Sequence, residues 1–309
     1  MKTRNRIFLV GLLVAVLGVF AWLVLRQSRE PDYQGRPLTF WLAGYDEANY
    51  LLAHPGGPSP PTRGQADEAI RQIGTNAIPL LLGMLQQHES KTKVAIMRLL
   101  QRQNFIKFRF ALESQDYKAY CGFTALGIAA SNAVPRLIAI FERDPAPLPQ
   151  LGIPVIWGYM GVSAGRASPV LFRHGLTHTN ALVRNNSIHA LRQIHADAKL
   201  VVPAMIESLK DPDEMVRAQA VRTLGAFGKN AEAAVPALVE LWRKEPPPVR
   251  FKPGSIDGTA VGTSWGPSQF SWGPGPPDVA KLAMEALQSI DPEAAAKAGI
   301  KGGATWSAP

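Results

Sequence analysis

The stretch DPDEMVRAQAVRTLGAFGKNAEAAVPAL at residues 211–238 decides the fold, because its pattern returns along the chain. Its closing Ala-Val-Pro phrase recurs with small changes at Ala77-Ile78-Pro79, Ala133-Val134-Pro135, Ala167-Ser168-Pro169 and Val201-Val202-Pro203, each time followed by apolar residues. From Pro135 to Pro236, the prolines of successive Ala-Val-Pro phrases are 34, 34 and 33 residues apart. Self-similarity at such a period predicts a solenoid, in which each unit buries its apolar face against its neighbours.

Each repeat is predicted to contain two helices. Proline is tolerated at the first position of a helix, because its missing N–H would have no partner there. One helix is therefore expected to open at each proline, over residues 79–87, 135–142, 169–174, 203–209 and 236–243. Shifting the sequence by one repeat indicates a second helix before the proline, because Leu224 then falls on Leu191, Trp157 and Phe123. Phe227, three residues further on, falls on Ile194, Met160 and Leu126, so both columns lie on one stripe of a helix.

In two of these units the helix that precedes the proline opens with a Val-Arg dipeptide, Val183-Arg184 and Val216-Arg217. This arrangement resembles HEAT repeats, particularly the short form of the bilin-lyase-like subfamily. The resemblance covers residues 66–298 and implies an all-α fold, a right-handed α-solenoid of helical hairpins. It implies an inter-repeat structural role for Asp211 and Arg217, because this Asp and Arg commonly link successive HEAT repeats. The preceding repeat has His178 at the Asp position, so we expect the Asp–Arg link between repeats to be absent there.

Two other repeat families have similar periods, the tetratricopeptide and ankyrin repeats. Their signatures, Trp-x-x-Leu-Gly-x-x-Tyr and Thr-Pro-Leu-His, are absent from the sequence. The HEAT resemblance is specific for the fold and says almost nothing about activity.

The repeat is interrupted twice. Pro79 and Pro135 are 56 residues apart, and the extra length includes the aromatic stretch QNFIKFRF at 103–110. The second interruption is an insertion at residues 245–277, rich in Gly and Pro but carrying Trp265, Phe270 and Trp272. Long segments of this kind in compact domains are usually functional or disordered. The sequence leaves open whether the insertion is a mobile loop or an ordered flap on the solenoid.

Residues 7–25, IFLVGLLVAVLGVFAWLVL, form an apolar run of 19 residues without a charge. At about 1.5 Å per residue, such a helix just crosses a hydrocarbon core of roughly 30 Å. A cleaved signal peptide would have a shorter apolar core and small residues at the cut site, so an uncleaved signal anchor is favoured. Basic residues nearly balance across the segment. We expect residues 1–6 to be a cytoplasmic tail and the repeats to be periplasmic or extracellular, in a single-pass membrane protein.

Residues 26–65 are predicted to form a juxtamembrane capping segment followed by a Pro/Gly linker, with a helix near Pro37 and Thr39. It is expected to cover the exposed face of the first repeat, as solenoids require. A membrane-surface helix is the alternative, suggested by Trp41 and Tyr45 close to the anchor. The lone cysteine, Cys121, permits no intrachain disulfide and is expected in the core. Residues 299–309 are expected to be a flexible tail.

The net charge of +9 invites a nucleic-acid interpretation, but it falls to 28 basic against 24 acidic residues once the five basic residues that flank the anchor are removed. A mildly positive inner surface would attract acidic proteins, anionic polysaccharide or lipid head groups. Nucleic acid is disfavoured, because it would require repeats that face the cytoplasm. The candidate partner-binding residues are the arginines expected on the inner helices and the aromatic residues of the insertion: Arg98, Arg102, Arg184, Arg192, Arg222, Trp265, Phe270 and Trp272.

Catalytic and cofactor motifs are absent from the sequence, including the nucleophile elbow, the phosphate-binding loop and Cys-x-x-Cys. His174 and His178 have a spacing that could present two imidazoles to a metal, but Gly175 and Thr177 lie between them, so no metal site and no cofactor are expected. The sequence predicts a membrane-anchored HEAT-repeat scaffold that binds a protein or polymer along its concave helix face, without catalytic activity. The alternatives are a lyase-like enzyme or an anionic-polymer binder on the same repeats, and a purely structural envelope component.

Overall fold

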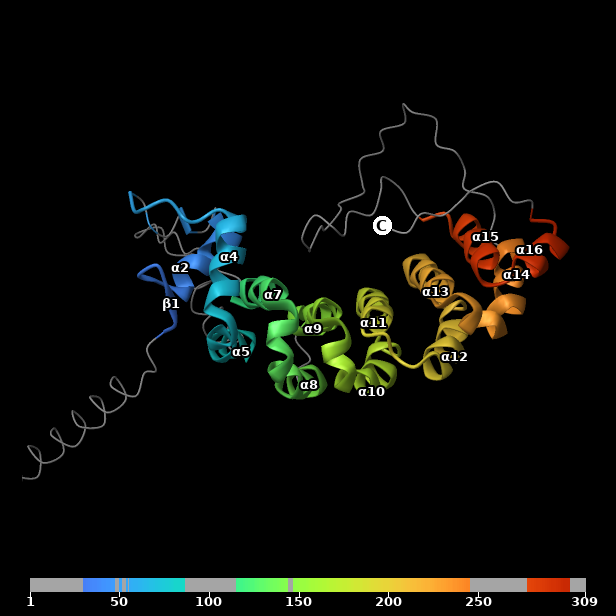
Figure 1. Cartoon of the computed structure of the whole chain (residues 1–309), viewed down its shortest axis with the longest axis horizontal. Coiled ribbons are helices and arrows are strands. Elements are labelled where there is room, and N and C mark those ends of the chain that lie inside the picture. Colours follow the sequence, from blue (N-terminus) through green and yellow to red (C-terminus); the bar gives the residue numbers. More distant parts are fainter. Residues whose placement is uncertain are drawn as a thin grey trace, which may run out of the picture.

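The computed structural model describes residues 30–47, 50–51, 54, 56–86, 115–143, 147–244 and 277–300. Over these residues the chain forms pairs of helices stacked into an arc (Figure 1). The predicted tail at 1–6, the predicted anchor at 7–25, the stretch at 103–110 and residues 245–276 of the insertion lie outside the described residues.

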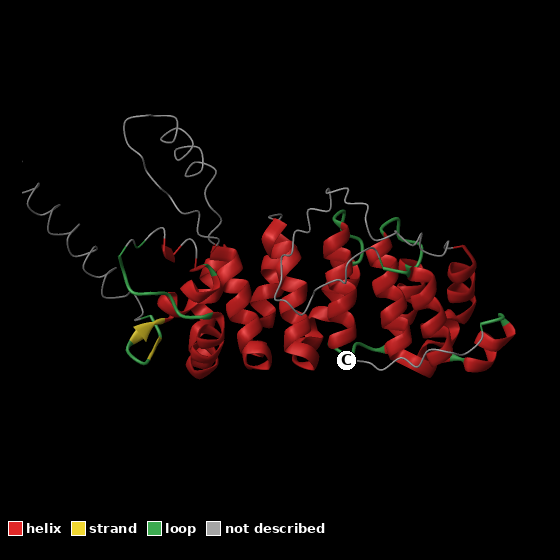
Figure 2. Ribbon diagram, turned by 90° about the horizontal axis from the view of Figure 1, so that it is seen from above, coloured by secondary structure: helices red, strands yellow, loops and turns green. Residues whose placement is uncertain are grey.

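The helices form two layers. The first helix of each pair contacts the first helix of the next pair, so that α7, α9, α11, α13 and α15 line the inner side of the arc (Figure 1) and stand side by side in Figure 2. These first helices are α4 (Arg63–Ile73), α7 (Gln115–Leu126), α9 (Pro147–Met160), α11 (Ala181–Gln193), α13 (Glu214–Phe227) and α15 (Val279–Ile290). The second helices form the outer layer: α5 (Ile78–Gln86), α8 (Val134–Arg143), α10 (Ser168–Val170), α12 (Ala198–Ser208), α14 (Val235–Lys244) and α16 (Pro292–Lys297).

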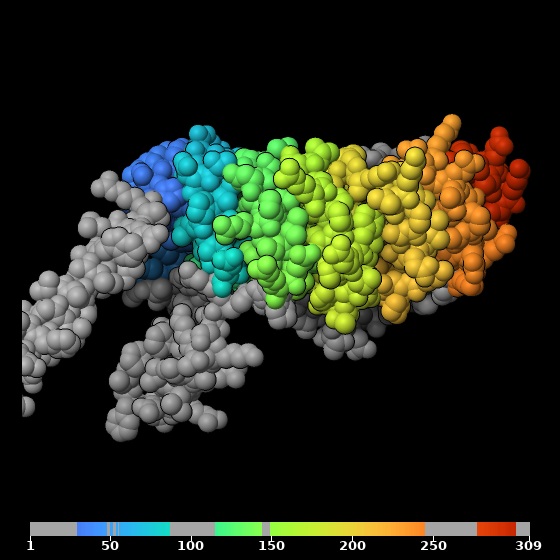
Figure 3. Space-filling model, turned by 90° about the horizontal axis from the view of Figure 1, so that it is seen from below, coloured from blue at the N-terminus to red at the C-terminus, as the bar shows by residue number. Residues whose placement is uncertain are grey.

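The outer layer is interrupted once, where α10 passes into the π-helical turn η5 (Leu171–Gly175). Seen from the outer side, the repeats follow one another in chain order along the molecule (Figure 3). The buried residues form one continuous apolar cluster from Leu38 to Ile300. Each unit therefore completes the core of its neighbour, as expected of a solenoid.

The chain reverses between the layers at a residue in the left-handed backbone region. This residue has φ between 50° and 62° in five successive pairs: Gly74, Gly127, Gly161, His195 and Gly228. Glycine enters this region without steric cost, whereas a residue with a Cβ is strained there. Short 3₁₀ turns follow the glycines: η2 (Gly74–Ala77), η3 (Gly127–Ala133), η4 (Gly161–Ala167) and η6 (Gly228–Ala234). The repeat therefore specifies its own turn, and His195 is the exception.

The predicted proline-opened helices hold with one correction. Pro79, Pro135, Pro169 and Pro236 are each the second residue of a helix, but Pro203 lies inside α12, which begins at Ala198. The predicted start at Pro203 is wrong because Asp197 caps the helix earlier, accepting a hydrogen bond from the Lys199 N–H at 3.0 Å.

The described part of the segment before the repeats packs against the first repeat. A two-stranded hairpin, β1 (Asp32–Tyr33) and β2 (Arg36–Pro37), leads into α2 (Leu38–Leu42) and η1 (Ala43–Tyr45), and α2 packs on α4. Trp41 and Tyr45 are buried, each 9% exposed, and the indole N–H of Trp41 donates to the carbonyls of Tyr33 and Arg36. Because a membrane-surface helix would expose these two rings, the packing favours the cap.

Within the described residues, one segment is long and apolar enough to span a membrane, Gln115–Arg143. It comprises α7, η3 and α8, which reverse direction at Gly127 and form one helical hairpin of the solenoid. Its apolar composition is explained by burial within the stack, because Phe123, Leu137 and Phe141 are each at most 2% exposed. This segment is therefore weak evidence for a membrane span.

Candidate functional site

Three of the eight predicted partner-binding residues lie in the described structure: Arg184 and Arg192 on α11, and Arg222 on α13. The other five lie outside the described residues: Arg98, Arg102, Trp265, Phe270 and Trp272. The three described arginines divide into two environments.

Arg184 takes part in an inter-repeat ion pair. Its Nε and Nη2 donate to the two carboxylate oxygens of Asp211, each at 2.7 Å, and the two side chains are 13% and 11% exposed. Its Nη1 also donates to the carbonyls of His178 and Thr179. Burial opposes the ionisation of Asp211, but hydrogen bonds from Arg184 and from the Asp213 N–H hold the pKa of this carboxyl below its usual value. The structure therefore places Arg184 in the link between α11 and the following repeat.

Arg217 occupies the position of Arg184 one repeat later. Its Nη1 donates to the carbonyls of Asp211 and Pro212, as the Nη1 of Arg184 does to those of His178 and Thr179. Asp211 is thus joined to both arginines, to Arg184 through its carboxylate and to Arg217 through its carbonyl. Sequence reasoning placed the link at Asp211 and Arg217, but it missed that Arg184 supplies the side-chain pair.

His178 stands where an Asp would continue this ladder. Its Nδ1 accepts the Asn180 N–H at 3.0 Å, just as Asp211 accepts the Asp213 N–H at 2.9 Å. His178 therefore keeps the local turn contact of the Asp. One repeat before Arg184 the chain has Gln150, whose side chain donates to the Phe141 carbonyl at 2.6 Å, so both partners of the ion pair are replaced together.

Arg192 and Arg222 lie on the inner layer together with His189 and Gln219. The Nδ1 of His189 lies 3.5 Å from both the Arg192 Nη2 and the Gln219 Nε2. Burial and the nearby charge of Arg192 lower the pKa of His189 to about 4. The imidazole is therefore neutral at pH 7, and Nδ1 is placed to accept from these donors.

Both guanidinium groups are partly desolvated. Burial lowers the pKa of Arg192. Burial and the charge of Arg192 lower that of Arg222, against the opposing effect of Glu285. Glu285 lies on α15, with a carboxylate oxygen 3.9 Å from the Nζ of Lys281. A small hollow of about 40 Å³ lies between α13 and α15, beside Arg222, Glu285 and Ser289. The inner layer thus carries a partly buried, net cationic cluster, Arg192, Arg222 and Glu285.

Towards the other end of the arc the inner layer is rich in tyrosine. Tyr117 and Tyr120 on α7 stack with ring centroids 6.3 Å apart, and Tyr120 lies against Gly152 of α9, where a Cβ would approach its ring to 3.2 Å. Buried Cys121 lies beside them, 3.9 Å from the Nη2 of Arg63, and burial raises the pKa of its thiol to about 11. The prediction of Cys121 as a core residue is confirmed, and its raised pKa makes it a weak nucleophile at neutral pH.

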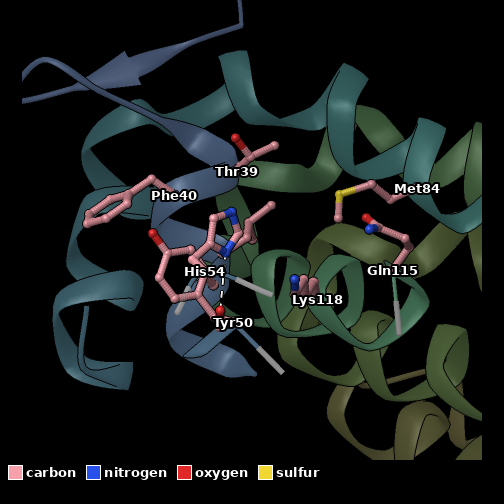
Figure 4. Close-up of a pocket in the computed structure, with 9 residues that line it drawn as sticks. Thr39, Phe40, Tyr50, His54, Met84, Gln115 and Lys118 are labelled. Carbon is pink, nitrogen blue, oxygen red and sulfur yellow. Dashed lines mark hydrogen bonds between the residues drawn. The ribbon is translucent and has the colours of Figure 1, made fainter. Parts of the chain in front are cut away.

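A larger pocket lies between the cap and the first repeats, with a volume of about 310 Å³ (Figure 4). Phe40, Leu42, Ala43 and Met84 supply apolar walls, and Thr39, Tyr50, His54, Gln115 and Lys118 supply polar groups. Tyr50 and His54 stack with centroids 4.4 Å apart, and Lys118 is 4% exposed. Sequence reasoning missed this pocket, because its walls come from three segments that no motif connects.

Among the described residues, no group of three or more His, Cys, Asp and Glu side chains comes together that could hold a metal ion. His174 is exposed, and His178 makes the turn contact described above.

A family model of HEAT repeats matches residues 163–252, which begin in η4 and include the pairs α11–α12 and α13–α14. The solenoid contains HEAT-like repeats. They indicate a helical-repeat scaffold for protein interaction and point to a non-catalytic role. No curated protein matches the chain.

Two solved structures of engineered proteins are similar to this chain. The first is 15% identical with a TM-score of 0.38, covering 84% of this chain and 61% of its own length. The second is 16% identical with a TM-score of 0.37, covering 80% of this chain and 96% of its own length. The chain spans about three fifths of the first of these proteins.

Proposed function

We propose that this protein is a single-pass membrane scaffold that binds a protein partner along the inner layer of its HEAT-like repeats. One observation carries the proposal: Arg192 and Arg222 lie half-buried on neighbouring helices of the layer that lines the arc, close enough for the charge of Arg192 to lower the pKa of Arg222. In the proposal the anchor is the apolar segment 7–25, with the N-terminus in the cytoplasm and the repeats outside. Arg98, Arg102 and the aromatic residues of the insertion extend the proposed contact surface.

Crosslinking pull-down from native membranes tests the partner. The inner-layer variant is the full chain with Arg192→Glu and Arg222→Glu. Its matched control carries Arg136→Glu and Arg243→Glu, which change the same charge on the exposed faces of outer helices α8 and α14. We expect one dominant partner to be lost from the inner-layer variant only. Equal recovery of that partner from both variants would contradict the proposal.

The anchor and its orientation have a separate test. We expect the full chain to stay in the membrane fraction at alkaline pH, and the repeats to be digested when a membrane-impermeant protease is added from the outside. Release at alkaline pH would contradict the anchor, and protection of the repeats would contradict the orientation.

A further inference from the structure

We propose that Arg192 and Arg222 form a binding notch for one carboxylate group, presented by an acidic side chain of a partner protein; this rests on the proposed scaffold function and names the chemistry that its inner layer recognises. The notch comprises Arg192, Arg222, His189, Gln219 and Glu285 on three neighbouring helices, α11, α13 and α15.

Among the described residues, Arg192 has no counter-ion for its half-buried charge. Within the described residues its Nε–H has no hydrogen-bond partner, and its guanidinium forms no ion pair. Its closest polar contact is His189 Nδ1 at 3.5 Å, and that imidazole is neutral. A desolvated cation left in this state is costly, so its presence is explained when an anion binds beside it.

Arg184 shows what the same side chain does when the fold supplies the acid. Both arginines lie on α11, eight residues apart. Two N–H groups of the Arg184 guanidinium donate hydrogen bonds to the two carboxylate oxygens of Asp211. Beside Arg192 the fold instead places Arg222, a second cation. A carboxylate of a partner protein could accept the same pair of hydrogen bonds from Arg192 that Asp211 accepts from Arg184.

In the neighbouring repeats the register position of Arg192 serves helix packing. Glycine stands at the position of Arg192 on both flanking inner helices, at Gly158 of α9 and Gly225 of α13. Each glycine in a helix interior costs about 1 kcal/mol relative to alanine. A Cβ at Gly158 would lie 3.5 Å from His189 Cδ2, and one at Gly225 would lie 3.3 Å from the Cβ of Ala286, so both glycines allow close packing on the next helix. Arg192 departs from this pattern by placing a charged side chain at the same position.

The charge balance of the notch favours a monoanion. Arg192 and Arg222 carry two positive charges, and Glu285, which acts on Arg222 from α15, offsets one of them. Lys281, 3.9 Å from Glu285, is 60% exposed and is mainly solvated. A side-chain carboxylate carries one negative charge, whereas a phosphate ester approaches two at neutral pH and would be repelled by Glu285. The ligand class is therefore an Asp or Glu side chain on a protein segment.

Fluorescence anisotropy with the purified full chain in detergent tests the ligand. The probes are three labelled twelve-residue peptides of one design, with glutamate, glutamine or phosphoserine at alternate positions. We expect the glutamate peptide to bind best, and Arg192→Gln to weaken it about tenfold or more. Arg192→Lys should weaken it too, because lysine lacks the planar fork. Arg243→Gln on the outer layer is the matched control and should leave binding unchanged.

Thermal unfolding supplies a second readout that does not depend on a probe. Arg192→Met keeps the length of the side chain and removes its unpaired charge, so we expect Tm to rise by roughly 2–4 °C while peptide binding is lost. A lower Tm would identify Arg192 as a structural residue and overturn the proposal. Preference for the glutamine or phosphoserine peptide, or equal binding by Arg192→Gln, would also overturn it. In each case the pull-down could still show a partner, so the scaffold and the notch can fail separately.

Discussion

The repeats α11–α12 and α13–α14 are related by 33 residues and share most of their interactions, so their differences are informative. Arg184 and Arg217 both donate to two carbonyls of the preceding loop, and Val183 and Val216 are both buried. These matched positions serve the fold.

The inner face and the turn differ between the same two repeats. His189 corresponds to Arg222, Arg192 to Gly225, and His195 to Gly228. All three exchanges bring a group that the repeat does not need: a half-buried neutral imidazole at His189, a half-buried cation at Arg192, and a Cβ at a positive φ at His195. Departures from the repeat therefore mark the positions where function, rather than folding, is the better explanation.

The largest effect is expected where the matched interactions join the two repeats. Asp211→Ala removes the carboxylate that pairs with Arg184 and leaves a largely buried guanidinium without its acid, so we expect a loss of about 3 kcal/mol in the free energy of unfolding. Urea denaturation of the full chain measures it. Glu207→Ala, which breaks an ion pair to Lys210 with both side chains at least 69% exposed, is the control and should have no measurable effect.

The pH dependence of this pair has a defined sign. Because the pKa of Asp211 is lowered in the folded state, its contribution is present above the unfolded pKa near 4 and is lost as the pH falls through the folded value. In Asp211→Ala the acid-induced loss of stability should be correspondingly smaller. Acid-unfolding curves that run parallel in the two proteins would contradict the importance of the ion pair.

The helix pairs could be predicted from sequence because their determinants are local. Apolar columns such as Leu191 and Leu224 identify the first helix, and Pro135 or Pro236 identifies the start of the second. The start of α12 was missed because a cap at Asp197 acts before the proline. A local signal overlooked in one repeat thus moved a helix boundary by five residues.

The site was less predictable, because it depends on which helix stands beside which. Arg184, Arg192 and Arg222 look alike in the sequence, and only the stacking brings Asp211 to Arg184 and Arg222 to Arg192. One signal could have separated them: Asp211 follows Arg184 by 27 residues, in the loop between α12 and α13, whereas the residue at the same interval after Arg192 is Gln219. Glycine on both flanking helices, at Gly158 and Gly225, was a second signal.

An intermediate effect is expected at His189, where the α13 repeat has an arginine. Its folded pKa of about 4 lies below the ordinary value of 6.5, so the unfolded state binds more protons between these values, and stability falls as the pH is lowered through this window. We expect His189 to account for roughly 2 kcal/mol of the loss between pH 7 and pH 5. His189→Gln should show a flatter profile in urea denaturation at each pH.

His174→Gln is the matched control for that profile, because it makes the same substitution at an exposed histidine of the outer layer. Coincident profiles for wild type and His189→Gln would show that the imidazole is protonated as readily in the folded protein as in the unfolded one. The imidazole on the inner face of α11 would then be as well solvated as a side chain on the outer surface.

The smallest effect is expected at the turn, where the two repeats can be exchanged directly. His195 has φ of 55° and Gly228 has φ of 53°, so both residues hold the backbone at a positive φ and differ in the side chain. His195→Gly should stabilise the protein by about 1 kcal/mol, and Gly228→Ala should destabilise it by a similar amount, because a Cβ is strained in this region. If His195→Gly instead destabilised the protein, the imidazole would be contributing contacts that outweigh the strain, and His195 would join His189 and Arg192 as a departure from the repeat that demands its own explanation.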